Sequence, residues 1–263
     1  MGVCGISMGR QGIAEHVHVL ADLDALSCEA AEHIVRVVAK YAQGSGWVSI
    51  ALGGGSTIRR LYELLAGASY RHRLPWDRVR VFWGDERCVP SDDPDSNFGL
   101  AWQRLLSKVP IPSANLYRVP TERGDSASVS AAYEATLRKV FGLQAGDLPV
   151  FTLILLGLGS DGHTASLFPH STALRQSHRL VTETTGGHPD VSRVTLTAPV
   201  LNHANEIMWL VAGTQKASVV HAVLEGPEQR QELPAQYVRP SQGASHWFID
   251  RAAAQRLSMR ASR

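Results

Sequence analysis

Asp161 and His163 are the residues of this sequence whose types and spacing best suit acid–base chemistry. They stand two residues apart in a glycine-rich turn that follows the apolar run at 153–156 (LILL). A histidine titrates near neutral pH and can take a proton from water, and an open α/β sheet carries its chemistry at such strand ends. A structural alternative is open at this point, because aspartate is a common helix N-cap and His163 could simply pack or face solvent.

The segment at 53–57 (GGGST) has the composition of a turn that binds an anion. It follows an apolar strand candidate at 47–52 and precedes residues 58–65, whose apolar side chains recur at helical spacing. Glycines let a phosphate approach the backbone, and the start of a helix offers free N–H groups and a positive dipole. The segment lacks the lysine of a Walker A loop and does not match GxGxxG, and an ordinary tight turn is the alternative.

Charged residues follow two further strand candidates. The triplet at 85–87 (DER) comes directly after the strand candidate at 79–83, and Lys216 follows the one at 206–211. Arginine offers a planar fork and lysine a compact charge, and both suit a phosphate dianion. The alternative for the triplet is a solvated loop of ion-paired charges.

The rest of the chain alternates strand and helix patterns. Further strand candidates stand at 16–20, 116–120, 179–183, 193–197, 236–239 and 246–248, the last two as edge strands. Helix candidates stand at 24–41, 98–106, 127–141, 199–204, 217–224 and 250–257. This alternation predicts an α/β fold with a mostly parallel, doubly wound sheet. Since the loops after parallel strands share the carboxyl edge, the glycine turn, the charged triplet, the Asp-Gly-His turn and Lys216 should meet there. Together they suit an enzyme that acts on a small phosphorylated substrate.

Metal chemistry and nucleophilic catalysis are less well supported by the sequence. It has no HExxH motif and no clustered set of histidine and cysteine ligands, and Pro169 stands between His163 and His170. Ser160 and Ser166 flank His163, but GxSxG is absent. We therefore expect no metal site. The remaining histidines are assigned to surface or packing roles, among them His33, His72, His178 and His221.

The composition is that of an ordinary globular chain. Its 263 residues are 44% hydrophobic and 19% charged, and the formal net charge of +2 is too small to indicate a nucleic-acid or acidic-membrane partner. The three cysteines are widely spaced, so a reducing compartment is expected rather than a disulfide framework. No apolar run is long enough to span a bilayer and no signal-peptide core is present, so we expect a cytoplasmic protein.

We expect a flexible leader over residues 1–15, a single domain over 16–257 and a tail over 258–263. The sequence does not decide between a monomer and a small homo-oligomer.

A series of segments, in this order, resembles the 6-phosphogluconolactonase family. They are GGGST at 53–57, WGDERCVP at 83–90, SNFGLA at 96–101, GLGSDGHTASLFP at 157–169, RVTLT at 193–197 and GTQKA at 213–217. The resemblance spans residues 16–255, and the Asp-Gly-His segment with the upstream DER triplet is its most specific part. It implies a three-layer α/β fold similar to those of glucosamine-6-phosphate deaminase and ribose-5-phosphate isomerase.

The resemblance also implies an activity and roles for individual residues. The activity is hydrolysis of 6-phospho-D-glucono-1,5-lactone to 6-phosphogluconate, the second step of the oxidative pentose phosphate pathway, with no metal or cofactor. His163 is the implied general base, and Asp161 would orient it or tune its pKa. The implied substrate-binding residues are Gly54, Gly55, Ser56, Thr57, Asp85, Arg87, Asn97, Arg193 and Lys216.

Two alternative functions are weighed against this one. The deaminase branch of the same superfamily shares the glycine turn and the Asp-Gly-His turn. It carries DEY where this chain has DER at 85–87, and an AFNEP-like run where this chain has TASLFP at 164–169. A non-enzymatic sugar-phosphate sensor would keep the phosphate-binding turn but would need no base.

Overall fold

The structure is a computed structural model that describes residues 4–8, 15–43, 46–187 and 191–258. Its largest element is a seven-stranded sheet with the strand order β1-β2-β10-β9-β6-β3-β4. These strands are β1 (Cys4–Met8), β2 (Glu15–Leu20), β3 (Val48–Leu52), β4 (Val79–Trp83), β6 (Leu153–Leu156), β9 (Glu206–Val211) and β10 (Ala244–Asp250). All neighbouring strands in this sheet are parallel except β1 and β2. The predicted α/β fold with a mostly parallel sheet is therefore confirmed.

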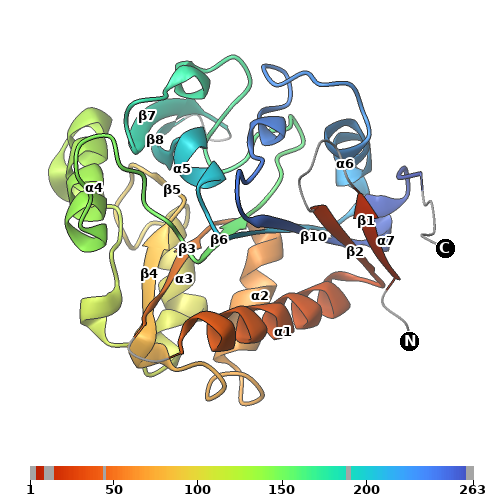
Figure 1. Ribbon diagram of the computed structural model, residues 1–263, viewed down its shortest axis with the longest axis horizontal. Helices are drawn as coiled ribbons and strands as arrows, with labels where there is room; N and C mark the ends of the chain where they lie inside the picture. The colour runs from red at the N-terminus through yellow and green to blue at the C-terminus, as the bar shows by residue number, and fades with distance from the viewer. Residues whose placement is uncertain (1–3, 9–14, 44–45, 188–190, 259–263) are drawn as a thin grey trace.

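Helices cover both faces of this sheet (Figure 1). α1 (Leu23–Tyr41) and α2 (Ser56–Ala66) lie on one face, while α5 (Ala198–Asn202) and α6 (Ala217–Leu224) lie on the other. Because both faces are covered, β6 and β9 are buried at every position, which explains their unbroken apolar sequences. The remaining helices are α3 (Asn97–Arg104), α4 (Ser126–Phe141) and α7 (Arg251–Ala254).

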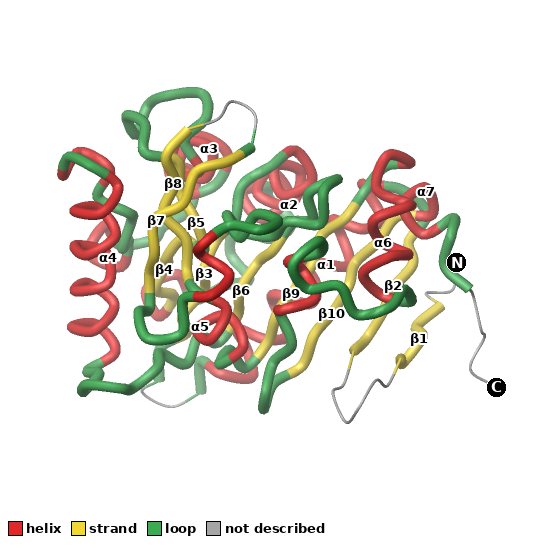
Figure 2. Tube along the Cα trace, turned by 90° about the horizontal axis from the view of Figure 1, so that it is seen from above, coloured by secondary structure: helices red, strands yellow, loops and turns green. Residues whose placement is uncertain are grey.

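A second, three-stranded sheet was not predicted from the sequence. It has the order β5-β8-β7, with antiparallel pairing of β5 (Asp85–Arg87), β8 (Val191–Leu196) and β7 (Val181–Gly186). Figure 2 shows α4 standing beside β7 and β8. The DER triplet is thus a short strand rather than a loop, and its pairing with residues more than a hundred positions away leaves no local pattern.

Three further expectations about the elements are wrong. The segment 246–248 is part of β10, which lies between β2 and β9 and is not an edge strand. The segment 236–239 overlaps a 3₁₀ turn at Pro234–Tyr237, since a proline at the first helical position favours such a turn. In place of the strand predicted at 116–120 there is a single bridge between Leu116 and Val81.

The segment expected as a leader, residues 1–15, contains a described strand. Cys4–Met8 form β1, whose backbone pairs antiparallel with β2 along its whole length. Residues 1–3 and 9–14 of that leader, and 259–263 of the expected tail, lie outside the described residues. Within the described part of the chain, the structure contains no helix long and apolar enough to cross a membrane.

Candidate active site

A pocket of about 220 Å³ opens at the carboxyl edge of the large sheet, where β3, β6 and β9 end. The loops that follow the strands line it, as the alternation of strands and helices predicts. All but one of the predicted site residues line the pocket: Gly54, Gly55, Ser56, Thr57, Asp85, Arg87, Asn97, His163, Arg193 and Lys216. The exception is Asp161, which contacts the ring of His163 instead.

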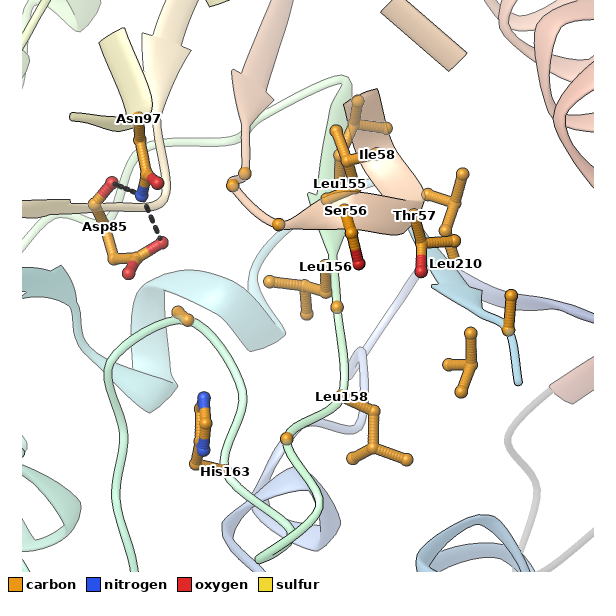
Figure 3. Close-up of a pocket in the computed structure, with 18 of the residues that line it drawn as sticks. Ser56, Thr57, Ile58, Asp85, Asn97, Leu155, Leu156, Leu158, His163 and Leu210 are labelled. Atoms are coloured by element: carbon orange, nitrogen blue, oxygen red, sulfur yellow. Dashed lines mark hydrogen bonds between the residues drawn. The ribbon is translucent and has the colours of Figure 1, made fainter. Parts of the chain in front are cut away.

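The glycine turn after β3 presents an unblocked helix start to this pocket. Gly55 has a φ of 104°, and no side chain caps the first turn of α2. The N–H groups of that turn are therefore available to an anion. In Figure 3 the hydroxyl groups of Ser56 and Thr57 approach the pocket from the side opposite the ring of His163. The buried hydroxyl of Tyr62 donates a hydrogen bond to the Gly53 carbonyl oxygen at 2.7 Å. This bond fixes the start of the turn to α2.

Gly54 is required by close packing within this turn. A Cβ atom at this position would lie 1.9 Å from the side-chain oxygen of Asn97. Asn97 is itself held, because its amide nitrogen donates to the Asp85 carbonyl oxygen at 2.9 Å. The glycine therefore lets the turn after β3 pack directly against the start of α3.

His163 and Asp161 form a hydrogen-bonded pair at the pocket. The Nδ1 atom of His163 lies 2.5 Å from Oδ1 of Asp161. Partial burial alone would raise the pKa of Asp161, but the hydrogen bond and charge of His163 outweigh it and lower that pKa below its ordinary value. An ionised carboxylate only accepts hydrogen bonds, so Nδ1 is the donor of this pair, and in the neutral imidazole Nε2 is then the atom with a lone pair. The pair therefore has the form of an oriented general base.

The turn between β6 and residue 167 is shaped around this histidine. The Gly159 N–H donates to the His163 carbonyl oxygen at 2.8 Å, and a Cβ on Gly159 would lie 2.1 Å from Nδ1 of the same ring. The Asp161 carboxylate also accepts the backbone N–H of His163 at 3.2 Å. No helix starts in this turn, so Asp161 does not cap one, and the alternative reading of this residue is wrong.

Three cationic side chains line the same pocket. Arg87 and Arg193 face each other across β5 and β8, and Lys216 enters from the loop after β9. Burial lowers the pKa of Arg193, and the neighbouring positive charge of Arg87 lowers it further. Burial likewise lowers the pKa of Lys216, against the opposing charge of Asp161.

These cations are only partly neutralised by the protein. Arg193 donates to the Gly186 carbonyl oxygen at 2.7 Å and Arg87 donates to the Asp95 carbonyl oxygen, so both arginines bond to neutral groups. The Nε atom of Arg87 is buried and has no hydrogen-bond partner among the described residues. The opposing charge near the Lys216 ammonium is that of Asp161, which is itself hydrogen-bonded to His163. Such a set of cations suits a dianionic ligand.

Asp85 and Asn97 line the pocket, and hydrogen bonds to other residues already engage the Asp85 carboxylate and the Asn97 amide nitrogen. Asp85 accepts from the hydroxyl of Ser166 at 2.6 Å and from the amide of Asn97 at 3.3 Å. The carboxylate therefore joins the loop after β6 to the start of α3. Ser166 follows Ala165, a pocket residue held at a φ of 47°, a strained backbone conformation for a non-glycine residue.

Glu86 is a structural residue of the site that sequence reasoning missed. Its carboxylate is 2% exposed and accepts the backbone N–H groups of Asn97, Phe98 and Arg87 at 2.7, 2.7 and 2.8 Å. Burial raises the pKa of this carboxyl to about 7, although these three hydrogen bonds oppose the rise. Glu86 thus fixes the start of α3 against β5. The only signal in the sequence was an acidic residue placed inside the charged triplet.

Comparison with known proteins places the chain in a family. The sequence profile described as glucosamine-6-phosphate isomerases/6-phosphogluconolactonase matches residues 21–247. The chain belongs to this family. A member named 6-phosphogluconolactonase from Synechocystis sp. is 42% identical over 85% of this chain and 89% of its own length. Another with that name from Nostoc sp. is 38% identical over 92% of this chain and 98% of its own length.

Solved structures agree with this family assignment. A 6-phosphogluconolactonase from Trypanosoma cruzi is 31% identical, with a TM-score of 0.83 over 96% of this chain and 99% of its own. The enzyme of that name from Trypanosoma brucei is 32% identical, with a TM-score of 0.81 over 92% of this chain and 98% of its own. A monomeric glucosamine-6-phosphate deaminase is 19% identical, with a TM-score of 0.76. That last likeness concerns the fold alone, and it agrees with the predicted deaminase-like architecture.

Proposed function

We propose that this member of the family hydrolyses 6-phospho-D-glucono-1,5-lactone to 6-phosphogluconate, as a step of the pentose phosphate pathway. The observation that carries the proposal is the pairing of His163 with Asp161 beside a pocket that also holds an uncapped helix start and three cations. The more similar relatives named above are 6-phosphogluconolactonases, which supports the same choice.

In the proposed reaction the free Nε2 atom of His163 takes a proton from water as the water oxygen attacks the lactone carbonyl carbon. The carbonyl π electrons move to oxygen and give a tetrahedral oxyanion. Backbone N–H groups of the glycine-rich turn at 157–162 are the proposed donors to that oxyanion. When the carbonyl re-forms, the bond to the ring oxygen breaks. The proton on His163 then passes to this oxygen, which becomes a hydroxyl group, and the base is regenerated.

The proposed contacts to the phosphate come from two directions. The N–H groups and hydroxyls of Ser56 and Thr57 approach from the start of α2. The charges of Arg87, Arg193 and Lys216 come from the second sheet and from the loop after β9. With the phosphate held in this way, the lactone carbonyl can be positioned near His163, and such positioning is itself a large part of catalysis.

Asp161, Asp85 and Asn97 are proposed as positioning residues. Asp161 fixes the tautomer of His163, and the other two join the loops that form the pocket walls. We infer that Asp85 and Asn97 support the substrate site rather than bind the phosphate. An anionic carboxylate would repel it, and the Asn97 amide already donates to Asp85.

A coupled assay tests the proposed activity. The lactone is generated enzymatically in the cuvette, and formation of 6-phosphogluconate is followed above the spontaneous rate, with and without a metal chelator. We expect rapid hydrolysis that the chelator does not abolish. Release of ammonia from glucosamine 6-phosphate would instead support the deaminase branch, and binding of phosphate esters without lactone hydrolysis would support a sensor.

A further inference from the structure

A group of histidines and one glutamate lies at the end of the large sheet opposite the candidate active site. Glu206 is the first residue of β9, whereas Val211, at the far end of that strand, lines the active-site pocket. At about 3.3 Å per residue the two ends are roughly 16 Å apart. Next to Glu206 lie His246 of β10 and His33 of α1. Any chemistry at this cluster is therefore physically separate from the lactone site.

The strand register explains why these side chains meet. Glu206 pairs with Ala244, and His246 stands two residues further along β10, on the same face of the sheet. His16 of β2 pairs directly with His246, and His18 follows at the next position on that face. Helix α1 covers this face (Figure 1). His33 is one of its buried residues. Residues from four distant parts of the sequence are thus brought together.

The distances within the cluster fit a small metal ion. The Nε2 atoms of His33 and His246 lie 2.9 and 3.8 Å from the same oxygen, Oε2, of Glu206. All three ligand atoms lie within 4.8 Å of one another. Tetrahedral zinc with bonds of about 2.0–2.1 Å places its ligands roughly 3.3–3.4 Å apart, so small side-chain shifts suffice.

The types of these side chains also suit a metal ligand set. Nε2 of His33 and Oε2 of Glu206 share a hydrogen bond of 2.9 Å, and a bound metal takes the place of its hydrogen. Neutral imidazole nitrogens and a carboxylate oxygen are the usual non-thiolate ligands of zinc.

Two neighbours complete the surroundings of the cluster. Nε2 of His18 lies 3.5 Å from Nδ1 of His246. Since Nε2 of His246 faces Glu206, Nδ1 is the ring atom left for a supporting hydrogen bond, as in other metal-bound histidines. The ammonium of Lys40 lies 3.7 Å from the other oxygen of Glu206, Oε1, and leaves Oε2 for a metal.

We propose that His33, Glu206 and His246 bind a divalent ion of the zinc class, with water in the fourth position, and that this ion ties α1 to β9 and β10. The ion is structural and takes no part in lactone hydrolysis. The site joins a helix near the start of the chain to a strand near its end, so its occupancy stabilises the folded chain by mass action.

The test uses the full chain after chelator treatment, with Co²⁺ and Zn²⁺ as probes. Titration with Co²⁺ is followed by visible absorption, and Zn²⁺ binding is followed by calorimetry and by the Tm. We expect one equivalent of metal per chain and a rise of Tm with Zn²⁺. Glu206→Gln and His33→Gln, which preserve polarity and approximate size, are expected to weaken binding at least about ten-fold, a typical loss for a changed ligand environment.

Controls separate this site from other ligands in the chain. His72→Ala changes an exposed histidine, Cys28→Ser removes an exposed thiol on α1, and His163→Ala tests the lactone site. All three should retain the Co²⁺ spectrum. Unchanged lactonase turnover in Glu206→Gln or His33→Gln shows that the variant is folded. An unchanged binding isotherm in either folded variant, or loss of the metal in His163→Ala, would overturn the proposal.

Discussion

At the scale of single residues, the Asp161 carboxylate decides which nitrogen of His163 carries the hydrogen. The carboxylate lies 2.5 Å from Nδ1, so in the proposed mechanism the lone pair of Nε2 is the one that takes the proton from water. The sequence predicted both residues because they stand two positions apart after a buried strand. It could not predict the bond between Ser166 and Asp85, since those residues are 81 positions apart and neither belongs to a motif that requires the other.

Lys216 gives a residue-scale prediction about pH. Burial lowers the pKa of its ammonium, so the side chain loses its proton at a lower pH than an exposed lysine does. Binding of inorganic phosphate as a competitive inhibitor should therefore weaken at a lower pH than the ordinary pKa of a lysine would give. Lys216→Arg should remove this dependence, because arginine stays charged.

A neutral replacement of Lys216 tests its contribution to binding directly. Lys216→Met should raise KM about ten-fold, in line with the loss of roughly 1.5 kcal/mol from one charge-assisted hydrogen bond, and change kcat less. Lys139→Met, at an exposed position on α4, is the matched control. An unchanged KM in Lys216→Met would remove this residue from the phosphate site.

At the scale of elements, strand-to-helix turns were predictable and long-range strand pairing was not. The apolar runs of β3, β6 and β9, each followed by a turn, indicated a shared carboxyl edge. The pairing of β5 with β8 left no local trace, so the face-to-face placement of Arg87 and Arg193 appeared only in the structure. The histidine cluster was hidden for the same reason, because its members come from β2, α1, β9 and β10.

Gly54 provides the prediction at this scale. Gly54→Ala places a methyl group against Asn97, which is held by Asp85, so the turn after β3 or the start of α3 must move. We expect KM to rise at least about five-fold with a modest loss of Tm, measured by steady-state kinetics and thermal melting. Gly84→Ala is the control, because its Cβ would meet only an ordinary contact at 3.6 Å. Equal behaviour of the two variants would contradict the packing argument.

At the scale of the whole molecule, the positive charge available to a substrate is concentrated at one pocket. The chain has a formal net charge of only +2, yet Arg87, Arg193 and Lys216 line one pocket. We also propose that the domain begins with β1 rather than at residue 16, since Cys4–Met8 extend the large sheet. Composition alone could not show this concentration of positive charge, because it depends on loops from both sheets.

This distribution predicts a dependence on ionic strength. Raising the salt concentration from about 0.05 to 0.5 M shortens the Debye length several-fold and screens the attraction of the dianionic substrate. KM should therefore rise while kcat changes little. A neutral lactone without phosphate serves as the control and should show no such dependence. Equal salt effects on both substrates would argue against electrostatic capture by the pocket.

The central claim, that His163 is the general base, is tested most directly by the kcat of His163→Ala in the coupled lactone assay. We predict a fall of about 10²–10⁴-fold, the usual contribution of general base catalysis, with little change in the Kd of 6-phosphogluconate. His170→Asn, at an exposed histidine of the same segment, should keep wild-type turnover. Turnover of His163→Ala close to that of the wild type would contradict the assignment.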